Sequence, residues 1–255
     1  MFSESDGYER FMGRWSRRLA PLFVTFAGVT EGDRVLDVGS GTGALSSAAA
    51  AIESVRVTGI EPSAAYVRYA QKHADGRFEV GDALALPFSD DAFDRTLSML
   101  VLNFVLDPAA ALQQMIRVTR PGGVVAAAVW DYGDGMQMLR TFWDAAIALD
   151  PDAAPRDERR MPLSTRGSLA ELWRTHGLEG VDEQPLTIEM VFASFDDYWQ
   201  PLLGGQGPVG TYVTSLDEDL RRRLAEAVRR AYCSGAPDGE RSLTATAWAI
   251  RGTVP

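Results

Sequence analysis

The chain has 255 residues, 46% of them hydrophobic and 24% charged, which is the mixture of an ordinary globular protein. No apolar run reaches the roughly 20 residues of a membrane span, and the first residues do not resemble a signal peptide, so we expect a cytoplasmic protein without membrane contact. The net charge of -10 disfavours a nucleic-acid partner. A single cysteine, Cys233, excludes an internal disulfide, and we expect no metal site.

From Arg34 to about Trp130, short β-rich runs alternate with helical stretches, which is typical of βαβ units around a parallel sheet. Pro62 is expected in the first turn of the second helix, where a missing N–H costs nothing. The predicted helices cover 44–54, 62–74 and 108–120, and the five predicted strands cover 34–39, 56–61, 77–83, 92–100 and 124–130.

The pattern becomes less regular after Trp130. A polar connection with prolines is expected at 151–162, and a glycine-rich separator at 204–210. Helices are predicted within 131–150, 168–177, 194–203 and 215–233, and strands at 183–192 and 242–252. Aromatic residues in and after the fifth strand are each expected in the core, but as a set they are candidates for the wall of an apolar substrate cavity: Trp130, Tyr132, Trp143, Phe192, Phe195, Tyr198 and Trp199.

The stretch VLDVGSGTG, residues 35–43, places three glycines directly after a predicted buried strand. A loop between a parallel strand and a helix brings the backbone close to a ligand, and glycine permits both the tight turn and the approach. The spacing also satisfies a looser dinucleotide-binding pattern, so the glycines alone do not separate the two kinds of nucleotide-like ligand.

Three carboxylates are expected at the same end of the sheet. Asp37 lies within the glycine stretch, and Glu61 and Asp82 end the second and third strands. A pyrophosphate would gain nothing from Asp37, whereas S-adenosylmethionine carries an ammonium and a sulfonium that acidic surroundings favour. The charges favour S-adenosylmethionine. An NAD-dependent oxidoreductase is the alternative, and so is a module that binds S-adenosylmethionine without transferring methyl groups.

Five motifs in order, VLDVGSGTG, GIEPS, GDALALPF, FDRTLSMLVLNFVLDP and RPGGVVAAAVW, resemble those of the class I S-adenosylmethionine-dependent methyltransferases. The residues of these motifs are most similar to those of the small-molecule branch that serves ubiquinone and menaquinone biosynthesis. The resemblance implies one α/β domain, a Rossmann-like three-layer sandwich whose seven-stranded, mostly parallel sheet has an antiparallel last strand. It also implies an N-terminal helical cap (1–30), a cofactor-binding core (31–132), substrate-side helices with the sixth strand (133–240) and the last strand (241–255).

The first motif of this family supplies backbone contacts to the cofactor. The resemblance implies that Gly39, Ser40, Gly41 and Gly43 line the methionine part of S-adenosylmethionine, and that Asp37 organises its amino group.

The second and third motifs are implied to hold the adenosine. Glu61 would accept hydrogen bonds from both ribose hydroxyls, with Pro62 and Ser63 beside the adenine. Asp82 would meet the adenine amino group, and Ala83 would offer a backbone contact.

The remaining implied cofactor contacts lie farther apart in the sequence. Met99 and Leu100 end the fourth predicted strand. The segment YERFMGRWSRRLAP is similar to cap segments of the quinone branch, so Tyr8, Met12 and Arg14 are expected to close over the cofactor.

Methyl transfer is an in-line displacement, and it needs a base only when the acceptor has a proton to lose. No residue in the sequence stands out as that base, and the weak candidates are Asn103, Tyr8 and Tyr132. The quinone branch has a His-His pair after strand four, but Asn103 and Phe104 stand there, so no histidine role is inferred. Because motifs of nucleic-acid methylating enzymes are absent, we predict a small-molecule acceptor; the acceptor itself and the oligomeric state stay open.

Overall fold

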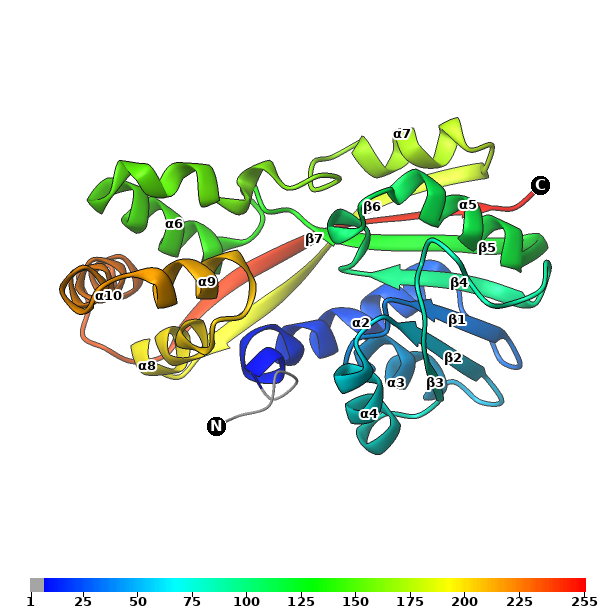
Figure 1. Cartoon of the computed structure of the whole chain (residues 1–255), viewed down its shortest axis with the longest axis horizontal. Helices are drawn as coiled ribbons and strands as arrows, with labels where there is room; N and C mark the ends of the chain where they lie inside the picture. Colours follow the sequence, from blue (N-terminus) through cyan, green and yellow to red (C-terminus); the bar gives the residue numbers. More distant parts are fainter. Residues whose placement is uncertain (1–6) are drawn as a thin grey trace.

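A computed structural model describes residues 7–255 (Figure 1). Within this range seven strands form one sheet in the order β3-β2-β1-β4-β5-β7-β6. The register pairs β5 and β6 with β7 in antiparallel fashion, and the other neighbours in parallel. The predicted Rossmann-like sheet with an antiparallel last strand is confirmed. The strands are β1 (Arg34–Val38), β2 (Arg56–Glu61), β3 (Arg77–Val80), β4 (Phe93–Met99), β5 (Thr119–Trp130), β6 (Glu179–Phe192) and β7 (Arg241–Thr253).

Helices cover both faces of the sheet (Figure 1). On one face lie α2 (Arg14–Ala27), α3 (Ala44–Ala50) and α4 (Ala64–His73), and on the other lie α5 (Pro108–Val118) and α7 (Ser168–Thr175). Where β5 is covered on both sides, its run 125–130 is apolar and fully buried. In the described residues, no helix is both long enough and apolar enough to cross a bilayer.

The N-terminal half has one helical turn that was not predicted and one helix that begins later than predicted. A short π-helical turn, η1 (Glu9–Gly13), precedes α2, and both elements lie in the segment 1–30 predicted as a helical cap. Residues 1–6 of that segment lie outside the described residues, and the role of the segment as a cap stays a prediction. Pro62 is not in the first turn of α4, because Ser63 is the N-cap and its Oγ accepts the N–H of Tyr66 at 3.4 Å. A hydroxyl oxygen at the N-cap satisfies an otherwise unpaired helix donor, so the cap moves the helix start past the proline.

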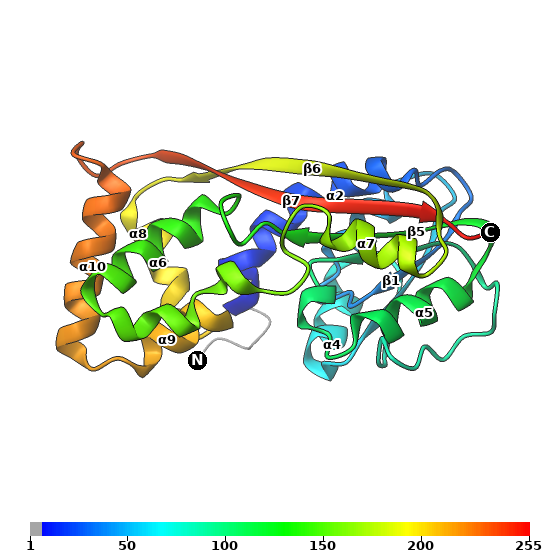
Figure 2. The same ribbon diagram turned by 90° about the horizontal axis from the view of Figure 1, so that it is seen from above.

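Strands β6 and β7 extend well beyond β5. The pairing of β5 with β7 ends at Trp130 and Ala247, whereas β6 continues beside β7 as far as Arg241. A second group of helices lies along this overhang, at the far end of the molecule from α5 and α7 (Figure 2). They are α6 (Gln137–Leu149), α8 (Phe195–Trp199), α9 (Gly207–Ser215) and α10 (Glu218–Cys233). Helix α9 begins inside the predicted glycine-rich separator, with Pro208 in its first turn.

The polar connection predicted at 151–162 is folded onto α6. It forms two 3-10 turns, η3 (Pro151–Arg156) and η4 (Glu158–Arg160). Arg140 of α6 donates to Asp157 Oδ2 at 3.0 Å, and Arg159 Nε donates to the same carboxylate at 2.6 Å. This buried ion pair fixes η4 against α6. As a result Glu158, the next residue after Asp157, is buried.

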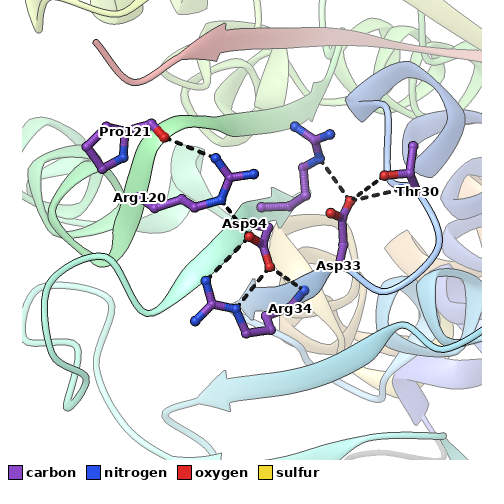
Figure 3. Close-up of polar contacts among 7 residues, drawn as sticks. Thr30, Asp33, Arg34, Asp94, Arg120 and Pro121 are labelled. Carbon is purple, nitrogen blue, oxygen red and sulfur yellow. Dashed lines mark hydrogen bonds and ion pairs between the residues drawn. The ribbon is translucent and has the colours of Figure 1, made fainter.

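A polar network ties together the amino ends of the central strands (Figure 3). Asp94 of β4 accepts the backbone N–H of Arg34 at 2.8 Å and Arg120 Nε at 2.6 Å. Beside it, Asp33 accepts Arg95 Nε at 3.1 Å. The arginine contacts hold the pKa of Asp94 well below its usual range despite some desolvation. The network lies at the opposite end of the parallel strands from the glycine loop.

Candidate active site

The carboxyl ends of β1, β2 and β4 open on a cavity of about 180 Å³, called the first cavity. The glycine loop between β1 and α3 forms one wall, and the N–H groups of Gly39 and Ser40 donate to the carbonyl of Ile60 at 2.8 and 3.0 Å. The loop is thereby anchored to the end of β2. Eight residues predicted to contact the cofactor line this cavity: Tyr8, Asp37, Gly39, Ser40, Gly41, Glu61, Met99 and Leu100.

The side chain of Glu61 connects the two loops at this end of the sheet. Its Oε2 accepts the backbone N–H of Gly41 at 3.1 Å, and its Oε1 accepts that of Ser63 at 3.0 Å. The carboxylate is 8% exposed. Two backbone donors satisfy one oxygen each of this buried carboxylate, so the acid is held in place before any ligand arrives.

Asp37 is the most buried acid of the site, with 1% exposure. Burial raises the pKa of its carboxyl to about 7, the hydrogen bond that Ser46 Oγ donates at 2.7 Å opposes this, and the nearby charge of Glu61 adds to it. A positively charged ligand group in the first cavity would stabilise the ionised carboxylate. The site therefore favours a cation next to Asp37.

Glycine is required at two positions of the loop for different reasons. Gly39 has φ +76°, and a Cβ there would lie 2.5 Å from Cγ1 of Val101. Gly43 has φ +91° and precedes α3, where a Cβ would collide with Ala74. Gly39 therefore permits close packing at the cavity wall, whereas Gly43 serves the packing of α3 and does not line the cavity.

The other predicted cofactor residues lie outside the walls of the first cavity. Asp82 is exposed and accepts the N–H of Leu84 at 2.9 Å, with Ala83 beside it. Arg14 donates to Asp197 at 2.7 Å and lies over the ring of Trp15. The roles predicted for Pro62, Ser63, Asp82, Ala83 and Arg14 stay predictions.

A second cavity of about 210 Å³ adjoins the first and contains Met12 in its wall. The two cavities share the wall residues Tyr8, Tyr66, Leu100 and Phe104. Leu100 has φ +67°, a conformation that costs an L-residue about 1–2 kcal/mol. This strained residue lies where the cavities meet, a position at which strain is commonly part of function.

The second cavity lies between the two groups of helices and its wall is mostly apolar. Trp130 and Tyr132 come from the end of β5 and the residues after it, and Phe11 comes from η1. Leu139 and Glu158 come from α6 and η4. Of the aromatic set proposed from sequence, Trp130 and Tyr132 line this cavity, whereas the other five are buried in the core without lining either cavity.

The three predicted candidates for a base occupy different positions. Tyr8 lines both cavities and shares a hydrogen bond of 3.1 Å with Ser16. Tyr132 lines the second cavity, and burial raises its pKa, with the charge of Glu158 adding to the effect. Asn103 lines neither cavity; it is 5% exposed, near the Tyr132 hydroxyl, and within residues 7–255 its amide atoms have no well-formed hydrogen bond.

Sequence reasoning missed Tyr66 and Glu158. Tyr66 is on the first turn of α4, three residues after its N-cap, and its ring lies 5.7 Å from that of Tyr8. Glu158 lies in a segment without hydrophobic periodicity, and its charged neighbours gave no sign of burial. Over the residues the structure describes, no group of three or more His, Cys, Asp or Glu side chains could hold a metal ion.

Comparison with known proteins indicates a methyltransferase domain. Residues 36–127 match the family model of a methyltransferase domain. An uncharacterized protein of Mycobacterium tuberculosis is 28% identical over 231 residues, 87% of this chain and 84% of that protein. The 2-methyl-6-phytyl-1,4-hydroquinone methyltransferase of Synechocystis is 32% identical over 184 residues, 69% of this chain and 56% of the enzyme.

Among solved structures, phosphoethanolamine N-methyltransferase 2 of Haemonchus contortus, in complex with phosphomonomethylethanolamine and S-adenosylhomocysteine, superposes with a TM-score of 0.60 at 17% identity. The match covers 98% of this chain and 57% of that one. This likeness concerns the fold alone. The fold, the motif order and the family match together place the chain in the class I S-adenosylmethionine-dependent methyltransferases, to which it belongs.

Proposed function

We propose that the chain transfers a methyl group from S-adenosylmethionine to a small, mostly apolar acceptor. The observation that carries this proposal is the junction of the two cavities: four wall residues are common to both. A cofactor held against the glycine loop would face an acceptor enclosed by aromatic side chains. When bound, S-adenosylmethionine supplies an electrophilic methyl group on a sulfonium.

The first cavity has groups that fit this cofactor. Asp37 is buried without a cationic partner among the described residues, and a ligand ammonium would supply one. Ser40 Oγ is buried and lacks a hydrogen-bond partner in residues 7–255, so a donor or acceptor on the ligand would satisfy it. Glu61 stands at the end of β2, where a ribose would meet it.

The second cavity has the properties that a methyl acceptor site needs. Its wall is mostly apolar, and an apolar surface suits a transition state in which charge disperses. A cavity of about 210 Å³ is of the size that holds one or two aromatic rings, since an apolar cavity of roughly 150 Å³ binds benzene. The Synechocystis relative, a hydroquinone methyltransferase by name, supports an aromatic acceptor.

The NAD alternative is less well supported. Asp37 lines the first cavity together with the glycine loop, against which a dinucleotide would place its pyrophosphate, and an ionised Asp37 would repel that group. Calorimetric titration with S-adenosylmethionine, S-adenosylhomocysteine and NAD distinguishes the two candidate cofactors. We expect one-to-one binding of the first two and no heat from NAD; binding of NAD alone would overturn the proposal.

A further inference from the structure

Among residues 7–255, Glu158 is the one carboxylate in the wall of the second cavity. It is 7% exposed, and Trp143 Nε1 donates to its Oε2 at 2.7 Å. Among the described residues, Oε1 accepts no hydrogen bond, and this oxygen is accessible to solvent. One oxygen is thus held by the indole, and the other is available to a ligand.

The charged and titratable groups around Glu158 come from three parts of the chain. Helix α6 contributes Arg140, whose charge lowers the pKa of Glu158, and the chain before η4 contributes Asp157, which raises it. These two form an ion pair of 3.0 Å and largely compensate each other. Tyr132, after β5, faces the carboxylate in neutral form. Burial dominates and raises the pKa of Glu158 to about 7, where a carboxyl serves best as a base at neutral pH.

We propose that Glu158 is the catalytic base that receives, at Oε1, the proton of an aromatic hydroxyl group, so that the chain methylates phenol-type acceptors on oxygen. This inference rests on the proposed function. The O–H bond breaks and its electron pair stays on the acceptor oxygen, which forms the new bond to the methyl carbon. The electron pair of the broken carbon–sulfur bond goes to sulfur.

A hydroxyl acceptor fits this cavity better than an amine. A neutral phenol enters an apolar cavity without losing the hydration of a charge, whereas a protonated amine would have to be desolvated. Flat rings suit walls that include Phe11, Trp130 and Tyr132. Once bound, the hydroxyl needs an acceptor for its hydrogen, and the carboxylate of Glu158 provides it.

Trp143 is a positioning residue in this arrangement. Its N–H stabilises the ionised carboxylate through Oε2, which opposes the effect of burial on the pKa of Glu158. Removing that donor should raise the pKa of Glu158 further. Trp143→Phe therefore tests the assignment without altering the carboxylate itself.

The test is the pH dependence of ligand binding, with naphthol and methoxynaphthalene as probes in calorimetric titrations. Only naphthol can donate to an ionised Glu158, so its affinity should rise about tenfold from pH 6 to pH 8 for a group with a pKa near 7. Methoxynaphthalene should bind with no such rise. Glu158→Gln should remove the rise, and Trp143→Phe should move it to higher pH. The control is Glu226→Gln, which replaces an exposed carboxylate on α10 and should leave the pH dependence of naphthol binding unchanged.

The inference would be overturned if naphthol did not bind, if both probes gave equal pH profiles, or if the rise persisted in Glu158→Gln. If Glu158→Gln does not fold, an unshifted profile in Trp143→Phe has the same force. Naphthylmethylamine binding more tightly than naphthol would instead indicate an amine acceptor and contradict it. Wild-type chain that binds neither S-adenosylmethionine nor its product would refute the proposed function, whereas normal cofactor binding with a flat naphthol profile refutes the role of Glu158 alone.

Discussion

Glu61 Oε2 accepts the backbone N–H of Gly41 across the gap between β2 and the glycine loop, at 3.1 Å. The same carboxylate accepts the N–H of Ser63 on its other oxygen. The loop that follows β1 and the turn that leads into α4 are therefore fixed by one side chain. Because this arrangement exists without ligand, the first cavity is formed in advance and binding does not have to order it.

Replacing Glu61 with glutamine should weaken cofactor binding. The amide nitrogen would face one of the two backbone donors, which leaves a buried N–H unsatisfied at a cost of about 1–3 kcal/mol. We expect the affinity for S-adenosylhomocysteine to fall roughly tenfold or more in calorimetric titrations. Glu53→Gln is the matched control, because Glu53 is exposed and lies outside the cavity. Equal affinities in the two variants would remove Glu61 from the site.

Asp37 should make cofactor binding depend on pH. With a pKa near 7 in the free protein, the carboxyl is largely protonated at pH 5.5, and a cationic ligand favours the ionised form. The affinity for S-adenosylmethionine should therefore rise about tenfold between pH 5.5 and pH 7, with protons released on binding. Titrations in buffers of different ionisation enthalpy measure this release. Asp37→Asn should bind weakly and independently of pH; proton uptake by the wild type would contradict the assignment.

Substitutions at two glycines with similar backbone conformations can distinguish the effect of backbone strain from that of a steric clash. Gly39 (φ +76°) and Gly32 (φ +81°) would both strain an alanine, by about 1–2 kcal/mol, but only at Gly39 does a Cβ meet Val101. Gly32→Ala should lower the free energy of unfolding by that amount and bind cofactor normally. Gly39→Ala should lose more stability and most of its cofactor affinity, because the loop must shift. Denaturant unfolding and titration together measure both effects, and identical behaviour of the two variants would argue against close packing at the wall.

Asp94 should stabilise the fold without affecting the site. Its pKa is lowered in the folded chain, so its contribution is present above the unfolded pKa of about 3.9 and is lost as the pH falls below it. Asp94→Asn should lower the free energy of unfolding at pH 7 by about 1.5–3 kcal/mol, the range for hydrogen bonds to charged groups. The loss should shrink in acid. Asp90→Asn, which breaks an exposed pair with Arg117, should cost under about 1 kcal/mol.

The cofactor half of the site could be predicted because its signals are local. Asp37 and Glu61 each stand at the end of a β-rich run, and carboxyl ends of neighbouring parallel strands meet at one edge. The glycine positions follow from one tight turn between strand and helix. The seven-stranded sheet with an antiparallel last strand came from the family resemblance. The strand order was not predicted, since pairing of β7 between β5 and β6 depends on contacts far apart in sequence.

The sequence indicated Trp130 and Tyr132 as candidates for the wall of the second cavity, but not Glu158, whose position is defined by tertiary packing. Glu158 becomes buried only because Arg140 and Arg159 hold Asp157 against α6. Trp143 then meets the carboxylate from fifteen positions earlier in the chain. Nor does the sequence around Leu100 indicate a positive φ, which depends on its N–H reaching the carbonyl of Ala128 at 2.7 Å.

The most direct test of the account is release of S-adenosylhomocysteine from S-adenosylmethionine, with a panel of phenols, hydroquinones, amines, thiols and carboxylates as acceptors. We predict product release with at least one apolar aromatic acceptor, accompanied by an equal amount of the methylated compound. S-adenosylmethionine that binds but is never converted across the panel would contradict methyl transfer, and would identify the chain as a cofactor-binding module instead.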